Sequence, residues 1–373
     1  MIATETDLNP QKASHSNLER WRTLATGGLR QMLDPDQQLF CYRMVKTPQG
    51  LRREGISRRY TLITLMGLHR LERSGGASPI PLQPILEGLL ADTSWVDNLG
   101  DLGLLLWLCA LAAPDRCAQV ADRLAIRHAL LRYPDAQQAR TMELAWFLTG
   151  LCHWALALPA EGEMLTGIAF EARRRLHRNL AACAVFPHMA RGTTLAGRLR
   201  WWAGSFADQV YPIYAFTKFA QAWSSPVAQR LALDCARAIC RAQGARGQWW
   251  WHYDASNAGR VEIVDAYPVF SVHQHGMAPM VLFEAGEAFQ QNFTPWIYKG
   301  LDWIDANNEL HFPMADGSLI WRGIERASYR RYWDALFNRP AAGEERSAKD
   351  LRVIFECRPY ELGWLLYAWA GRA

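Results

Sequence analysis

The chain has 373 residues, half of them hydrophobic, so it is long enough to bury a large core. Its formal net charge of +5 is spread along the chain without a long basic run, which argues against nucleic-acid binding. No apolar run reaches the ~18 residues that a membrane-spanning helix needs, and the N-terminus does not resemble a signal peptide. The eight cysteines form no C-x-x-C pair. We therefore expect a cytoplasmic protein with reduced core cysteines and no integral membrane segment.

Helical periodicity dominates the sequence, in segments of two kinds. The first kind has a charged face and comprises 16–33, 82–92, 115–132, 163–178, 226–242 and 294–306. The second kind is apolar nearly all round and comprises 57–73, 100–113, 142–158, 211–223, 277–290 and 359–371. The two kinds alternate six times, and only a helix with a charged face can lie at the surface. This predicts an all-α fold, a single-domain (α/α)6 toroid over 1–373 with six outer helices, six inner helices and a central cavity.

The connections between these segments carry their own predictions. Those at 34–56, 179–205 and 307–358 are long, and we expect the last to lie as a long loop over the mouth of the cavity. Residues 1–15 are predicted to be a flexible N-terminus. The stretch "GQWWWHYDASNAGRVEIVDAYP" predicts a short β-hairpin that turns at Ser256–Gly259.

Polar side chains stand at or near the start of every inner helix. If all six starts face the same end of the ring, these side chains converge on one site. Carboxyl, imidazole and phenol groups can transfer protons, so the catalytic candidates are Glu143, Asp208, Tyr211, His273, His275 and Glu361. Ordinary capping and interaction with the helix dipole explain Asp101 and Asp208 equally well.

The two closely spaced histidines lie in "YPVFSVHQHGMAP", residues 267–279. Because Gly276 and Pro279 follow, we predict an extended segment over 271–276 and a helix from Met277, so that both histidines face the cavity. A role in fastening this segment to a neighbouring helix remains open. The H-x-H pair supplies two metal ligands without a third at suitable spacing, so we expect neither a metal nor a cofactor.

Aromatic and polar side chains supply the binding candidates. In an extended segment Trp249 and Trp251 share one face and Trp250 points the other way, so one face can stack on a sugar. The last connection offers Asp316, Trp321, Arg322 and Glu325. The substrate-binding candidates are Arg59, Tyr60, Asp101, Gln209, Trp249, Trp251, Tyr267, Gln274, Trp321 and Arg358.

With the alternation and the stretch "GQWWWHYD…YP…HQHG" in view, the chain resembles the α/α-toroid superfamily. That superfamily includes six-hairpin glycosidases, polysaccharide lyases, sugar epimerases, and terpene-cyclase and prenyltransferase barrels. The resemblance implies a ligand in the cavity near the ends of the inner helices. The D-x-D-D motif of class II terpene cyclases is missing, and "GQWWW" occurs once where terpene cyclases repeat such an element.

We therefore expect a carbohydrate-active enzyme, a glycoside hydrolase, lyase or sugar epimerase, with a small-molecule or oligosaccharide substrate. The alternatives are an enzyme of isoprenoid chemistry in the same fold and a non-catalytic binding scaffold, because a fold by itself does not decide function.

Overall fold

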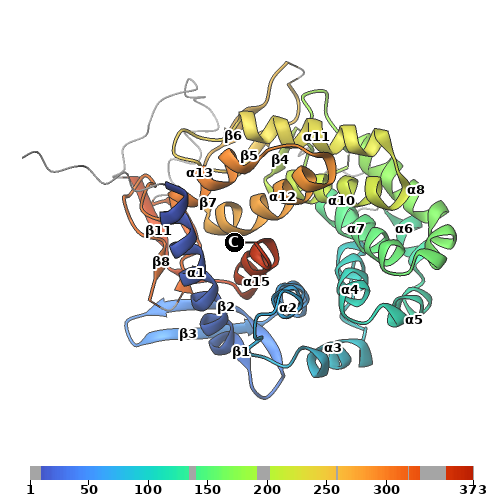
Figure 1. Ribbon diagram of the computed structural model, residues 1–373, viewed down its shortest axis with the longest axis horizontal. Helices are drawn as coiled ribbons and strands as arrows, with labels where there is room; N and C mark the ends of the chain where they lie inside the picture. Colours follow the sequence, from blue (N-terminus) through green and yellow to red (C-terminus); the bar gives the residue numbers. More distant parts are fainter. Residues whose placement is uncertain are drawn as a thin grey trace, which may run out of the picture.

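The computed structural model describes residues 10–133, 140–190, 202–257, 259–317, 319–327 and 350–372. Their helices form two concentric rings (Figure 1). The outer ring holds α1 (Pro10–Met32), α3 (Leu82–Ala91), α5 (Cys117–Arg123), α6 (Ile126–Arg132), α8 (Gly162–Asn179), α11 (Pro226–Arg241) and α13 (Thr294–Ile304). The inner ring holds α2 (Arg58–Arg73), α4 (Leu99–Ala112), α7 (Thr141–Ala157), α10 (Ala207–Trp223), α12 (Ala278–Phe289) and α15 (Pro359–Trp369). The predicted outer segment 115–132 is divided into α5 and α6, and the predicted (α/α)6 toroid is confirmed.

Glycines let neighbouring inner helices approach closely. A Cβ at Gly103 would lie 2.3 Å from the backbone nitrogen of Phe147, so α4 and α7 touch through their backbones. A Cβ at Gly67 would lie 2.2 Å from the carbonyl oxygen of Gly363, which brings α2 equally close to α15. Since no side chain fits at either contact, glycine is required there.

The middle of the ring is filled by aromatic side chains. The ring of Trp107 lies 5.0 Å from that of Tyr214, 5.2 Å from that of His153 and 5.4 Å from that of Trp364, measured between centroids. Tyr367 packs edge-on against Trp107, and all five side chains are buried. The sequence predicted a central cavity, but at this level bulky rings from α4, α7, α10 and α15 occupy the space. We call these five residues the aromatic interior.

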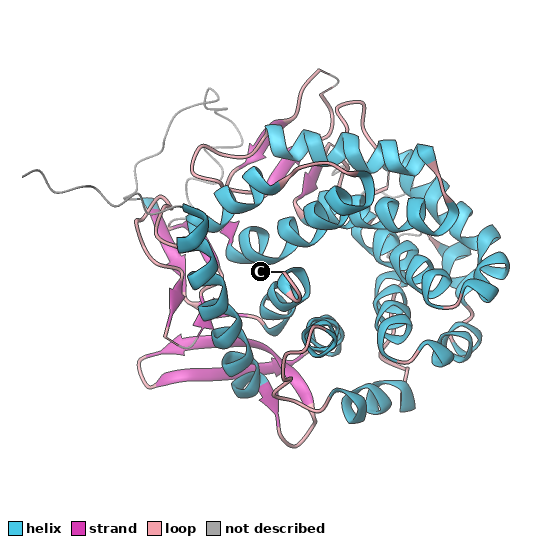
Figure 2. Cartoon of the chain, in the orientation of Figure 1, coloured by secondary structure: helices cyan, strands magenta, loops and turns pink. Residues whose placement is uncertain are grey.

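Short strands replace two of the predicted loops. The connection at 34–56 forms an antiparallel hairpin of β2 (Leu39–Thr47) and β3 (Gly50–Ile56), to which β1 (Leu33–Asp34) and β12 (Glu356–Cys357) add. The described part of 307–358 also contains β8 (Ala315–Asp316), β9 (Leu319–Ile320), β10 (Gly323–Arg326) and β11 (Leu351–Ile354). Figure 2 shows these strands gathered on the side of α1. The prediction of a long loop over 307–358 is therefore wrong for the described residues, because their backbone pairs with distant strands. Residues 328–349 of that connection lie outside the described residues, as do residues 1–9 of the predicted flexible N-terminus.

The predicted hairpin at 247–268 is confirmed. Its strands β5 (His252–Asp254) and β6 (Glu262–Asp265) pair antiparallel, and β4 (Ala203–Ser205) joins β5 on the other side. A further short strand, β7 (Val269–Phe270), pairs with β10. β4 leads directly into α10, and β7 leads toward α12.

The extended segment predicted over 271–276 is wrong. Residues 273–277 form the π-helical turn η3 (His273–Met277), which runs directly into α12. The sequence suggested an extended start because Gly276 and Pro279 follow, and Pro279 has no N–H group to bond within a helix. In the structure the carbonyl oxygen of His275, four residues earlier, instead accepts a hydrogen bond of 2.8 Å from Nε1 of Trp369. The helical turn points His273 and His275 in different directions.

Candidate active site

Four inner helices each place one buried carboxyl group in their first turn. These groups are Asp101 on α4, Glu143 on α7, Asp208 on α10 and Glu361 on α15. Negative charge near a helix N-terminus is favourable, which explains part of this placement. Their partners differ, however, and the partners determine what each group can do.

Glu143 is only partly hydrogen-bonded. Its Oε1 lies 3.4 Å from a guanidinium nitrogen of Arg140, and its Oε2 has no partner although it is buried. Burial raises the pKa of Glu143, while the positive charges of Arg140 and Arg59 oppose the shift. A carboxyl group of this kind favours its protonated form more than a free glutamate does.

Asp208 has the opposite character. Its Oδ2 accepts hydrogen bonds of 2.9 Å from the backbone N–H of Ser205 and 2.7 Å from the Ser205 hydroxyl, and it lies 2.9 Å from Nδ1 of His188. Burial by itself raises a carboxyl pKa, but His188 and Ser205 outweigh it and hold the pKa of Asp208 below its usual value. Its other oxygen, Oδ1, is buried without a partner.

His188 connects these two carboxyl groups through the backbone. Its carbonyl oxygen accepts a 3.0 Å hydrogen bond from the N–H of Thr141 at the start of α7, two residues before Glu143. Its own N–H donates to the carbonyl oxygen of Ala203 at 2.9 Å, in the strand that leads into α10. The segment around His188 therefore holds the starts of α7 and α10 together.

Gln209, a predicted binding residue, holds the same segment. Its Oε1 accepts from the N–H of Phe186 at 2.7 Å, and its Nε2 donates to the carbonyl oxygens of Phe186 and Ser205 at 2.8 and 3.0 Å. Because both ends of the amide are occupied by backbone groups, the structure gives Gln209 a role in positioning the backbone.

Arg59 and Asp101 form a two-point ion pair beside Glu143. The guanidinium nitrogens of Arg59 lie 2.6 and 3.1 Å from the two carboxylate oxygens of Asp101, and Asn98 donates to the same carboxylate at 2.8 Å. The Arg59 guanidinium also lies 5.6 Å from the ring centroid of Trp146. Asp101 is thus a fully engaged carboxylate, unlike Glu143.

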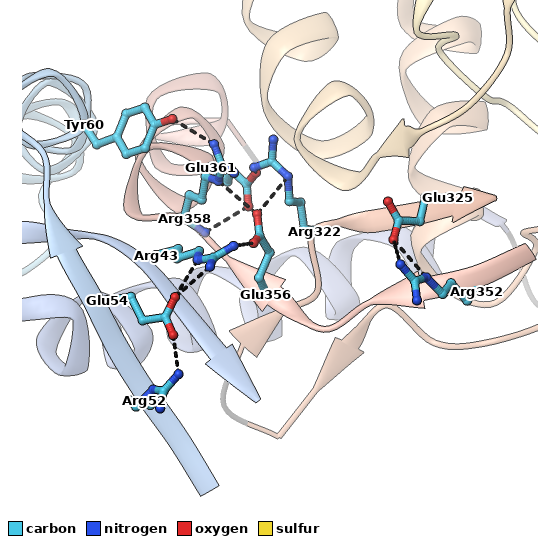
Figure 3. A network of polar contacts seen from close by, with 10 residues as sticks. All are labelled: Arg43, Arg52, Glu54, Tyr60, Arg322, Glu325, Arg352, Glu356, Arg358 and Glu361. Carbon is cyan, nitrogen blue, oxygen red and sulfur yellow. Dashed lines mark hydrogen bonds and ion pairs between the residues drawn. The ribbon is translucent and has the colours of Figure 1, made fainter. Parts of the chain in front are cut away.

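Across the ring, Glu361 belongs to a network of arginines and glutamates (Figure 3). Glu361 pairs with Arg322 and accepts a 3.0 Å hydrogen bond from the backbone N–H of Arg358. Glu356 lies within 3.1 Å of guanidinium nitrogens of Arg322, Arg358 and Arg43. Burial raises the pKa of Glu361, although Arg322 and Arg358 oppose it.

Tyr60 and Tyr211 each accept a hydrogen bond from a residue at the start of α15 or within it. The Tyr60 hydroxyl accepts a 3.0 Å hydrogen bond from Arg358, and Tyr60 follows Arg59 on α2. The Tyr211 hydroxyl accepts from Nε1 of Trp364 at 2.9 Å, and burial raises the pKa of Tyr211. A phenol of raised pKa stays protonated at neutral pH, so Tyr211 lacks the lowered pKa that proton abstraction requires.

The two histidines lie in a separate aromatic region. The ring of His273 lies 4.5 Å from that of Phe206 and 5.3 Å from that of Phe270, and its Nδ1 is 3.3 Å from the carbonyl oxygen of Trp249. Burial lowers the pKa of both His273 and His275 to about 3. Among the described residues neither imidazole bonds to any of the four carboxyl groups. The contact with Trp249 matches the alternative in which a histidine fastens this segment to its neighbour.

The other candidates are dispersed around this region. Trp249 packs on Phe206 and Trp251 on Phe270, whereas Trp250 points away and donates to the carbonyl oxygen of Ala242. Of the remaining three, Gln274 donates to the carbonyl oxygen of Phe270 in the same region, whereas Tyr267 donates to Glu309 and Trp321 packs against Phe355.

Sequence reasoning did not select His188, Arg140, Arg43 or Glu356. None of them lies in the first turn of an inner helix, and the periodic pattern carries no mark of them. Arg322 was noted in the last connection, but its link to Glu361 spans 39 residues and depends on the pairing of β10.

The described parts of the chain contain no group of three or more histidine, cysteine, aspartate or glutamate side chains suited to hold a metal ion. Within the same ranges, no helix combines the length and the apolar content needed to cross a membrane.

Comparison with solved structures places the fold. A possible member of the GH105 family from Klebsiella pneumoniae aligns with a TM-score of 0.61 and 10% identity, covering 99% of this chain and 95% of that one. An unsaturated glucuronyl hydrolase specific for heparin gives 0.57 and 14%, covering 95% and 96%. A mutant of the unsaturated glucuronyl hydrolase of Streptococcus agalactiae, complexed with dGlcA-GalNAc6S, gives 0.57 and 12%, covering 98% and 96%. No protein-family model and no curated protein matches the sequence. The chain has the (α/α)6 toroid fold of these proteins, and at such identities the likeness concerns the fold alone.

Proposed function

We propose that the chain is a carbohydrate-active enzyme that hydrolyses a glycosidic bond at the starts of α7 and α10. One observation carries the proposal. Glu143 and Asp208, on neighbouring inner helices joined through the His188 segment, have pKa values displaced in opposite directions. Glycoside hydrolysis uses such a pair. A protonated carboxyl group donates its proton to the leaving-group oxygen, and an ionised carboxylate activates the attacking water or attacks the sugar itself.

The roles follow from the partners of each group. Glu143, with its raised pKa, donates a proton to the leaving-group oxygen. Asp208, ionised and held by His188 and Ser205, acts on the attacking water. Each has one oxygen without a protein partner, Oε2 of Glu143 and Oδ1 of Asp208, and these are the atoms assigned to substrate and water.

The names of the structural neighbours support a saccharide substrate, since they describe glucuronyl hydrolases and one complex with dGlcA-GalNAc6S. The observations weigh against the alternatives. Isoprenoid chemistry needs a deep apolar cavity, and the aromatic interior fills the middle of the ring. Epimerase or lyase chemistry by Tyr211 or His273 requires pKa values near neutrality, whereas burial moves both away from it. The free cysteines fit a cytoplasmic location, which we also propose.

The test is turnover of an oligosaccharide panel, detected by mass spectrometry, with three proteins. The native chain should cleave at least one member, and Glu143→Gln should cleave it ~10²–10⁴ times more slowly because the proton donor is gone. Glu163→Gln is the matched control, since Glu163 lies in the first turn of an outer helix and is exposed. Thermal stabilisation by geranylgeranyl diphosphate and by no saccharide would instead support the isoprenoid alternative.

A further inference from the structure

A surface hollow of about 510 Å³ lies beside the arginine–glutamate network, where β2, β11 and β12 meet. Its lining includes Val45, Phe312, Arg352, Val353, Phe355 and Glu356. The wall is thus mainly apolar with a few charged groups, which is the usual make-up of a small-ligand site. We call it the β12 hollow.

Phe355 gives the β12 hollow a fixed aromatic surface. Its side chain is 40% exposed, an unusual fraction for a phenylalanine. Phe312 and Trp321 contact its ring edge-on, with centroids 5.9 and 5.3 Å away, and Nζ of Lys46 lies 5.0 Å from its centroid. These contacts hold the ring in one orientation. A sugar ring offers a face of C–H groups to an aromatic surface and a rim of hydroxyls to charged neighbours.

Charged side chains lie beside the aromatic surface of Phe355. Arg352, with a 57% exposed side chain, pairs with Glu325 at 2.6 Å on the wall of the hollow (Figure 3). Glu356, at the other side, is buried and bonded to arginines. Lys46, Arg352 and Glu325 therefore offer donors and acceptors next to the apolar surface.

Hydrogen bonds and ion pairs link the β12 hollow to the starts of α2 and α15. Arg322 contacts both Glu356, which lines the hollow, and Glu361, in the first turn of α15. Arg358, the residue between β12 and α15, contacts Glu356 and Tyr60. One chain of hydrogen bonds thus runs from the hollow to α2 and α15.

We propose that the β12 hollow is an accessory subsite that binds a further sugar unit of an oligosaccharide whose reacting unit lies at the helix starts. Phe355 stacks on that unit, and Lys46 and Arg352 bind its hydroxyl or acidic groups. This inference rests on the proposed function, because it assumes a saccharide at the mouth of the ring. It predicts that affinity increases with chain length.

The test measures Kd by calorimetry for matched disaccharides and tetrasaccharides of chondroitin, heparin and xylan, all in the Glu143→Gln background so that the probes stay intact. For at least one pair, the tetrasaccharide should bind about tenfold more tightly, equivalent to ~1.4 kcal/mol. Phe355→Ala should reduce that ratio to near one, and Phe355→Trp should keep it. Phe170→Ala is the matched control, because Phe170 is 41% exposed on the outer helix α8 and should keep the ratio.

The subsite is overturned if no pair shows a gain with length, or if the gain persists in Phe355→Ala. A melting curve for each variant shows that the fold is retained. The proposed function fails by a different result, when native protein and Glu143→Gln cleave the panel at equal rates. The two failures are therefore distinguishable.

Discussion

The starts of the inner helices differ from the aromatic interior in the bonding of their polar groups. At the helix starts, Glu143 and Asp208 each keep a buried oxygen without a partner, which costs stability. In the aromatic interior Nε2 of His153 is 3.2 Å from the Tyr214 hydroxyl, which is 2.8 Å from that of Tyr367, although Nε1 of Trp107 is buried without a partner. The unpartnered atoms at the helix starts are carboxyl oxygens, which a ligand can bond, whereas the interior mainly supplies aromatic packing.

Glu143→Gln tests the first half of this comparison and has the largest expected effect. Turnover should fall ~10²–10⁴-fold. The free energy of unfolding at pH 7 should not fall. Because the pKa of Glu143 is raised in the folded chain, its ionisation destabilises the fold as the pH rises through that pKa, and glutamine cannot ionise. Initial rates measure turnover, and urea unfolding midpoints measure stability. A large loss of stability would assign Glu143 to structure.

Trp107→Ala tests the second half. Trp107 is fully buried and contacts four other aromatic side chains, so its loss leaves a cavity among α4, α7, α10 and α15. We expect a loss of ~3–5 kcal/mol in the free energy of unfolding, measured with urea. A loss below ~1 kcal/mol would mean that the ring does not depend on its aromatic interior.

The buried histidines predict how stability depends on pH. Burial lowers the pKa of His273 and His275 to about 3, so in the folded chain they stay neutral while the unfolded chain binds protons below its pKa of ~6.5. Stability should therefore be full above pH 6.5 and fall as the pH drops from there toward 3. The melting temperature across this range measures the effect. Replacing both, as His273→Phe with His275→Leu, should flatten the profile without changing turnover at pH 7; an unchanged profile contradicts the prediction.

Tyr214→Phe has the smallest expected effect. It removes the hydroxyl that joins His153 to Tyr367 and leaves two buried polar groups without this partner, at a cost of ~1–3 kcal/mol. Turnover per folded molecule should stay unchanged. Tyr298→Phe, at a partly exposed tyrosine on α13, is the control and should alter neither quantity. A fall in turnover without a fall in stability would extend the active site into the aromatic interior.

The sequence was sufficient for the rings and for the carboxyl groups. A helix shows its environment in the distribution of its apolar residues, so the alternation of charged and apolar helices predicted both rings, and the turn residues predicted the β5–β6 hairpin. Glu143 and Glu361 were also expected near the starts of inner helices, where they lie. The helix expected from Tyr211 instead begins at Ala207, so Asp208 lies in its first turn and not before it. These are local properties, and neighbouring residues encode them.

Only the tertiary structure decided which groups meet and which spaces are filled. The pairing of β12 with β2 and of β10 with β7 brings Glu356 and Arg322 to α15, and hydrogen bonds across 20 residues bring His188 to Asp208. At the π-helical turn η3, the carbonyl oxygen of His275, which Pro279 cannot bond, accepts a hydrogen bond from Trp369, 94 residues away. Such contacts depend on partners far apart in the chain, so no local pattern records them. The physical reason is that burial and hydrogen-bond partners set a side chain's chemistry, and both arise only when the ring has closed.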